Sequence, residues 1–229
     1  DYLRTGHGMK DAPNEIRDML EAWLNDDTSY GGAGTCHVGL AMLLTGCRKA
    51  EILGDPDNDT GPMTWREVKF DRACIELDAE RIKTETGREI HFRETPLLGE
   101  LLRALHPQRT SDDAAVFEGI TIPMLDLAVK RVRNKTKRHF TAQLLRRTCG
   151  MILVNAPTIY SMPGMPAGAS IWLATQRLGH TVGVAEKHYL KQRVELPTDA
   201  STFEAASGIE TVARTIINRV ATTRMKEAS

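Results

Sequence analysis

Four short motifs in this sequence hold residue types that suit chemistry on a phosphate group. In chain order they read TGCRKAE at 45–51, KTETG at 83–87, QLLRRT at 143–148 and LGH at 178–180, and Tyr189 follows nine residues after His180. Arginine offers a planar, two-pronged donor to phosphate oxygens. A tyrosine hydroxyl, with a pKa of about 10, becomes a nucleophile when its proton is removed or its anion is stabilised. Each motif alone has a structural explanation, such as a surface arginine or a glycine helix cap, but their order and spacing favour one joint site.

In this order, the motifs resemble those of the tyrosine recombinase family, which includes phage integrases and chromosome-dimer recombinases. The match runs from about Thr35 to Tyr189 and covers most of the chain. The resemblance implies the catalytic-domain fold of that family and an enzyme that is a site-specific DNA recombinase, or integrase. Such an enzyme cleaves and rejoins DNA strands through a 3′-phosphotyrosine intermediate, here on Tyr189.

The resemblance also implies a role for each matched residue. Tyr189 is expected to attack phosphorus, and Lys83 to protonate the departing 5′ oxygen. Arg48 and Arg146 are expected to hold the non-bridging oxygens, and His180 to hydrogen-bond the phosphate. No cofactor is expected, because preorganised positive charge stabilises a phosphoryl-transfer transition state, so two arginines partly do the work of a metal ion.

The position three residues before the second arginine departs from the family pattern: histidine is usual there, and this chain has Gln143. Glutamine does not titrate, so it can hydrogen-bond a phosphate oxygen or a hydroxyl but cannot act as a general base. Three interpretations stay open. The site is an active natural variant, which we favour; it is weakened or decayed; or His139 substitutes, although its register argues against this.

The charge is balanced overall but uneven along the chain. There are 30 basic and 30 acidic residues, and 130–147 contains no acidic residue. A locally basic face on a neutral protein can hold a polyanion, although a charge run alone is more often a solvated helix face. We expect contacts to the phosphates of double-stranded DNA, which position DNA without reading its sequence, from Lys130, Arg131, Arg133, Lys135, Lys137, Arg138 and Arg147.

Composition and cysteine spacing exclude several other classes. No apolar stretch approaches the ~18 residues of a membrane helix, and the chain lacks a signal-peptide pattern at its start. The four cysteines and the histidines show no zinc-type spacing, so no metal site is expected. Reduced thiols favour a cytoplasmic location, which for a DNA enzyme means association with the nucleoid.

The periodicity predicts an α+β fold, mainly α-helical, with a small three-stranded antiparallel sheet. Helices are predicted at 13–25, 35–46, 48–53, 97–105, 122–132, 141–153, 171–178 and 207–225, and strands at 73–77, 81–84 and 89–93, with a hairpin turn at 85–88. We expect one catalytic domain over 1–229, with an irregular start at 1–12, a loop insertion at 155–169 and a C-terminal tail at 190–229.

The resemblance further implies that the tail helix packs onto a neighbouring protomer in a homotetramer on DNA, although its apolar stripe can also complete its own core. The separate N-terminal DNA-clamping domain of the family has no counterpart in this sequence, so the chain alone is expected to be a monomer. Three other interpretations stay open. One is a catalytically weakened or inactive DNA-binding relative of the integrases, and one is a type IB topoisomerase, which the LGH-to-Tyr189 spacing disfavours. The last is a helical interaction protein in which the motif residues are scattered in space.

Overall fold

The computed structural model describes residues 12–26, 34–79, 87–156, 169–179, 181–185, 196–197 and 199–227. The helices before the sheet are α1 (Ala12–Asp26), α2 (Gly34–Thr45) and α3 (Lys49–Leu53), with 3-10 turns at Pro56–Asn58 and Trp65–Glu67. The strands are β1 (Val68–Lys69), β2 (Cys74–Leu77) and β3 (Arg88–His91). After the sheet come α4 (Pro96–Leu105), a 3-10 turn at His106–Gln108, α5 (Ile122–Thr136), α6 (Ala142–Asn155), α7 (Ala169–Leu178), α8 (Val182–Ala185), α9 (Phe203–Ser207) and α10 (Glu210–Glu227).

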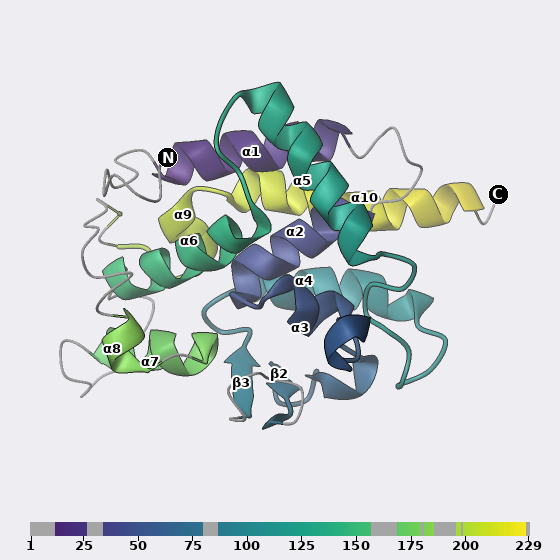
Figure 1. The fold of residues 1–229 in the computed structure, drawn as a ribbon, viewed down its shortest axis with the longest axis horizontal. Helices are drawn as coiled ribbons and strands as arrows, with labels where there is room; N and C mark the ends of the chain where they lie inside the picture. The colour runs from purple at the N-terminus through teal and green to yellow at the C-terminus, as the bar shows by residue number, and fades with distance from the viewer. Residues whose placement is uncertain are drawn as a thin grey trace.

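Helix α2 lies at the centre of the molecule (Figure 1). All its residues from Thr35 to Thr45 are buried, and a helix that is apolar all round must be surrounded by other elements. Helices α1, α4, α5, α6 and α10 all contact it. The α1 side of this packing depends on Gly39, since a Cβ there would lie 2.5 Å from the Trp23 ring. Helix α2 begins at Gly34, one residue before the predicted start, and Thr35 accepts a hydrogen bond from Trp23 Nε1 at 3.2 Å.

The sheet has the order β1-β2-β3 and both pairings are antiparallel. Side chains alternate between its faces, so Ile75 and Ile90 are buried in the core while Glu89 and His91 are exposed. The predicted strands at 73–77 and 89–93 are present as β2 and β3. In the described part of the chain they pair with each other, and the third strand is β1, which was not predicted. The predicted strand at 81–84 lies outside the described residues.

The other predicted helices are present, with two differences at their ends, and two short helices, α8 and α9, were not predicted. Helix α5 continues to Thr136, four residues beyond the predicted end. The last predicted helix is interrupted: α9 ends at Ser207, Gly208 adopts a φ of +65°, and α10 begins at Glu210. The predicted loop at 155–169 and the irregular start at 1–12 fall almost entirely outside the described residues, although Ala12 already begins α1.

The apolar stripe of α10 packs within its own chain. Val212, Ile216 and Val220 are buried, and α10 contacts α1, α2 and α4. His37 Nε2 of α2 donates to the Ile216 carbonyl at 2.8 Å. The apolar stripe thus completes the core of its own chain, one of the two alternatives expected from the sequence, and packing of the tail onto a neighbouring protomer stays a prediction.

The described residues thus form a mostly helical α+β fold with one small antiparallel sheet, which confirms the coarse fold prediction. Among the described helices, none combines the length and apolar character needed to cross a membrane.

Candidate active site

Two of the predicted site residues, Arg48 and Arg146, meet at one carboxylate. Arg48 caps α3, and its backbone N–H donates to Glu51 Oε2 at 2.6 Å while its Nη1 lies 2.9 Å from Glu51 Oε1. Arg146, from α6, places Nη1 3.9 Å from Glu51 Oε2. The motif spacing Arg-x-x-Glu is therefore a local helix cap that also provides the anion for a distant arginine.

A third arginine, Arg88, completes this cluster. Arg88 was predicted in the hairpin turn at 85–88, but it is the first residue of β3. Its side chain is buried and points into the protein. Its Nη2 donates to Glu51 Oε2 at 2.7 Å, and its Nη1 donates to the Leu178 carbonyl at 2.9 Å. Arg88 was not predicted as a site residue, because a Gly-Arg pair between two apparent strands is typical of an exposed hairpin turn. We call Arg48, Glu51, Arg88 and Arg146 the arginine cluster.

The end of α7 is tied to the arginine cluster. The Leu178 carbonyl accepts from Arg88 and also from Arg146 Nη2 at 2.5 Å. Gly179 follows with a φ of +63°, and a Cβ there would lie 2.7 Å from Arg88 Nη1. The glycine of the LGH motif is thus required twice, by the left-handed backbone and by the close approach of a guanidinium.

The glycine of the first motif has a similar function. Gly46 ends α2 with a φ of +69°, and a Cβ there would lie 2.3 Å from Leu178 Cδ2. Thr45 Oγ1 accepts from the Cys47 N–H at 3.0 Å, which fixes the turn. This geometry presents the Gly46 carbonyl to Arg146 Nη1, which donates to it. The TGxR motif therefore contributes Arg48 itself and a backbone carbonyl that positions Arg146.

The arginine cluster holds more positive than negative charge. Its three guanidinium groups and one carboxylate sum to +2, and the side chains of Glu51, Arg88 and Arg146 are 5%, 3% and 6% exposed. Burial raises the pKa of Glu51, but the charge of Arg88, the Arg48 N–H and the charges of Arg146 and Arg48 outweigh it and hold that pKa below its ordinary value. Burial and the repulsion of Arg88 lower the pKa of Arg146, against the attraction of Glu51.

This imbalance has a chemical meaning. A buried cation whose pKa is lowered by a like charge is stabilised when an anion binds beside it. Arg48, with 36% of its side chain exposed, is the member of the cluster that solvent reaches most easily. A ligand with two negative charges balances the net charge of +2. A phosphodiester does so too if it gains a second negative charge in the transition state.

The other predicted catalytic residues divide into two groups. Gln143 is exposed in the first turn of α6, one turn before Arg146, where Thr141 caps the helix by accepting from the Leu144 N–H at 3.2 Å. Lys83, His180 and Tyr189 lie outside the described residues, so the structure does not place them relative to the arginine cluster.

The predicted DNA-binding residues are mainly on α5. Two of them are neutralised by α1: Arg131 Nε lies 2.6 Å from Asp26, and Arg138 lies 3.3 Å from Asp18 and 3.7 Å from Glu15. The others on this helix and its C-terminal end are exposed, namely Lys130, Arg133, Lys135 and Lys137, and Arg147 on α6 is half-buried. The basic surface is therefore smaller than the sequence run indicates.

Another buried arginine, also missed by the sequence analysis, holds α7 against the sheet and the core. Arg177 donates to the carbonyls of Leu44 at 2.7 Å and His91 at 2.9 Å, and to Thr95 Oγ1 at 2.6 Å. It also pairs with Glu94 at 3.3 Å. No local signal could have identified it, because its partners are 82 to 133 residues away.

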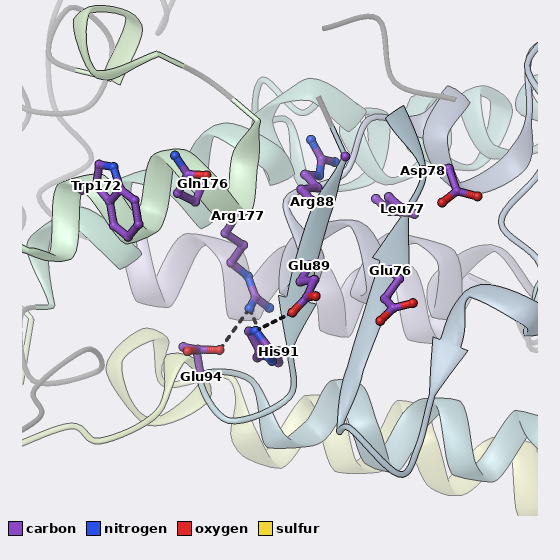
Figure 2. Close-up of a pocket in the computed structure, with 11 residues that line it drawn as sticks. Glu76, Leu77, Asp78, Arg88, Glu89, His91, Glu94, Trp172, Gln176 and Arg177 are labelled. Atoms are coloured by element: carbon purple, nitrogen blue, oxygen red, sulfur yellow. Dashed lines mark hydrogen bonds and ion pairs between the residues drawn. The ribbon is translucent and has the colours of Figure 1, made fainter. Parts of the chain in front are cut away.

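An open cavity of about 670 Å³ lies between α7 and the strands β2 and β3 (Figure 2). Four carboxylates line it, from Glu76, Asp78, Glu89 and Glu94, together with Arg88, His91 and Arg177. Its acidic lining makes it a poor place for a DNA backbone, so we do not assign it to the same chemistry as the arginine cluster.

The sequence matches no protein-family model, and no curated protein is significantly similar to it.

Proposed function

We propose that this chain is the catalytic domain of a site-specific DNA recombinase of the tyrosine type, which cleaves and rejoins DNA strands. One observation carries the proposal beyond the motifs themselves. Arg48 and Arg146, almost 100 residues apart in the chain, share Glu51 in a cluster with an excess of positive charge. A helical protein with chance motif matches has no physical reason to gather them.

In the proposed reaction, a scissile phosphate binds at the exposed side of the arginine cluster. Arg48 and Arg146 stabilise the charge that develops on its non-bridging oxygens. The Tyr189 hydroxyl releases its proton to water and forms a bond to phosphorus, the bond from phosphorus to the 5′ oxygen breaks, and Lys83 supplies a proton to that oxygen. His180 hydrogen-bonds the phosphate. The roles of Lys83, His180 and Tyr189 rest on the resemblance alone.

Arg88 adds a positioning role to this scheme. With 3% of its side chain exposed, it neutralises Glu51 and binds the Leu178 carbonyl. It therefore allows the carboxylate to stay between the two clamping arginines without removing their charge. It also links strand β3 to the end of α7, the segment that leads to His180.

The test is a trapped covalent adduct. A pool of duplexes with a randomised central segment, nicked within it on one strand, lets the short 5′-hydroxyl fragment diffuse away after cleavage, so the phosphotyrosine cannot be resealed. We expect wild-type protein to form a DNA adduct that survives denaturation and maps to the Tyr189 peptide. Tyr189→Phe should form none, while Tyr160→Phe, the matched control, should form the wild-type amount. An undiminished adduct in Tyr189→Phe contradicts the proposal.

Two further substitutions probe the same reaction. Arg48→Ala should slow adduct formation by about 10²–10³, the loss typical of one transition-state donor. Gln143→His should keep or raise cleavage, because it restores a residue that can donate and titrate at the exposed first turn of α6. A collapse of cleavage in Gln143→His would show that the glutamine has a specialised role.

A second candidate is a DNA-binding relative that has lost cleavage. Both Arg146 Nη groups donate to backbone carbonyls, those of Gly46 and Leu178, which engages donors that a phosphate would otherwise use. Gln143 favours the same interpretation. This candidate predicts salt-dependent binding of duplex DNA that weakens in Arg48→Ala, with no adduct on any nicked duplex.

A further inference from the structure

Three side chains with metal-ligand chemistry meet on the outer face of the sheet. Cys74 of β2 pairs directly with His91 of β3, so both side chains lie on the same face, and Glu89 is two residues before His91 on that face. One ligand atom from each, the Cys74 sulfur, a Glu89 oxygen and a His91 ring nitrogen, lie within 4.8 Å of one another. Figure 2 shows Glu89 and His91 turned toward each other.

The spacing of these atoms fits a small tetrahedral ion. His91 Nε2 lies 3.2 Å from Glu89 Oε2. Zinc bonds of about 2.0–2.1 Å to nitrogen and oxygen give a tetrahedral edge of about 3.4 Å, and a bond of about 2.3 Å to sulfur gives edges of about 3.6 Å. The histidine and the carboxylate are thus almost at the separation of two zinc ligands, and the thiol, within 4.8 Å of both, needs a shift of at most about 1.2 Å.

Cys74 also differs from the other cysteines. Cys36, Cys47 and Cys149 belong to the hydrophobic core, whereas Cys74 is buried but lies outside it. Charged side chains near it interact with its thiol electrostatically, namely Lys69, Arg72 and Glu89. Arg72 Nη2 lies 2.7 Å from Glu89 Oε1, and Arg72 also pairs with Glu76, which Lys69 approaches to 3.9 Å.

The backbone that carries the three residues is held on both sides. The Phe92 N–H donates to the Ala73 carbonyl at 2.8 Å, which extends the pairing beyond Cys74 and His91. Arg177 donates to the His91 carbonyl at 2.9 Å. Arg72 can keep Glu89 Oε1 while Oε2 binds a metal, and such outer hydrogen bonds orient metal ligands. Glu89 and His91 also line the 670 Å³ cavity, so two of the three ligands lie next to open space.

We propose that Cys74, Glu89 and His91 form a binding site for a divalent transition metal ion, with Zn²⁺ the best match. The ligand set combines a thiolate, an imidazole and a carboxylate, which together suit zinc and not the harder Mg²⁺ or Ca²⁺. The thiolate and the carboxylate balance the charge of the ion. The fourth position is open to water or a small ligand from the cavity, as in zinc sites with three protein ligands.

The site has a structural consequence that does not depend on the proposed function. The ion links β2 to β3 on the face opposite Arg88, which points from the same strand into the arginine cluster. It therefore fixes the strand that carries Arg88. No metal site was predicted from the sequence. Glu89 and His91 are 15 and 17 residues from Cys74, which is no zinc-type spacing, and only the pairing of β2 with β3 brings the three together.

Cobalt is the direct probe, because Co²⁺ replaces Zn²⁺ and a thiolate ligand gives an intense near-ultraviolet charge-transfer band. Metal-free, reduced full-length chain is titrated with Co²⁺ and then with Zn²⁺. We expect the thiolate band to appear with one equivalent of Co²⁺ and to disappear when Zn²⁺ is added. Cys74→Ser should abolish the band, and His91→Ala should weaken Zn²⁺ binding by at least about 100-fold, since even outer partners of a metal site are worth 10–100-fold.

His139→Ala is the matched control, since His139 is an exposed histidine on another surface, and it should bind Zn²⁺ like wild type. All four cysteines lie in the described residues and the other three are in the core, so the band reports on Cys74. Absence of the band in wild-type protein, or its persistence in folded Cys74→Ser, overturns the proposal. Equal zinc affinity of His91→Ala and His139→Ala does so too. DNA cleavage is not a readout here, so either proposal can fail alone.

Discussion

Glu51→Gln is the substitution that most directly tests the charge balance of the arginine cluster. Glu51 lies 2.9 Å from Arg48, 2.7 Å from Arg88 and 3.9 Å from Arg146, and its side chain is 5% exposed. Removing its charge raises the net charge of the cluster from +2 to +3 with almost no solvent to screen it. Loss of one partner from a buried ion pair costs about 3–5 kcal/mol.

Glutamine keeps an oxygen that can accept one of the hydrogen bonds, so we expect the loss to fall near the lower end, about 3 kcal/mol. The measurement is urea unfolding followed by far-ultraviolet circular dichroism near neutral pH. Asp113→Asn is the control, because Asp113 pairs with Arg66 at 2.7 Å while both side chains are about 70% exposed. An exposed pair contributes about 0–1 kcal/mol.

A double substitution isolates the electrostatic part. In an Arg88→Met background the cluster starts at +1 and Glu51→Gln returns it to +2, so the cost of Glu51→Gln should shrink by about 1–3 kcal/mol, the range of coupling between contacting residues. Two results would refute the reasoning. One is a loss in Glu51→Gln no larger than in Asp113→Asn. The other is an equal loss in the presence and absence of Arg88.

Three more predictions follow from the same structure. Gly179→Ala should lower the free energy of unfolding by about 1–3 kcal/mol, because Gly179 has a φ of +63° and an added Cβ would lie 2.7 Å from Arg88 Nη1. Gly183→Ala, whose Cβ would meet nothing within 4 Å, should change that free energy little. Equal effects of the two substitutions in urea denaturation would contradict this prediction. Burial raises the pKa of Glu204 from 4.5 to about 7 against its hydrogen bond from the Leu97 N–H. This group therefore contributes stability that is complete below pH 4.5 and lost as the pH rises through about 7. Above that pH, the free energy of unfolding of Glu204→Gln should exceed that of wild type by about 3 kcal/mol, and at acidic pH the two should be almost equal. A difference that does not change with pH would exclude this mechanism. Sulfate should raise the thermal midpoint more than chloride at equal ionic strength, partly by its general exclusion from protein surfaces, and Arg48→Met should reduce that difference; an unchanged difference would place the anion elsewhere.

The helices were predictable because their signals are local. The run of apolar residues at 35–46 predicted α2, which the structure shows to be buried on every face, and the periodicity from Thr141 predicted α6, which Thr141 caps. Of the predicted joint site, the structure brings Arg48 and Arg146 together at Glu51. The rest of that site stays a prediction, because Lys83, His180 and Tyr189 lie outside the described residues.

What could not be predicted depends on partners far along the chain. Arg88 was taken for a turn residue because a charged side chain after glycine is usually solvated, and nothing near it indicates that Glu51, 37 residues earlier, accepts it in the core. Arg177 is the same case. The break before α10 also escaped, since Ile209 continues the apolar periodicity across Gly208, while a φ of +65° ends α9 there.

The burial of α10 constrains when this chain can fold during synthesis. His37 bonds to the Ile216 carbonyl and Arg219 to the Leu24 carbonyl, over separations of 179 and 195 residues. The first two helices therefore leave the ribosome long before the helix that covers them, and their apolar surfaces stay open to water meanwhile. Contacts of such long range slow folding and expose intermediates to aggregation, so chaperone dependence and sensitivity to early chain termination should be pronounced in cells.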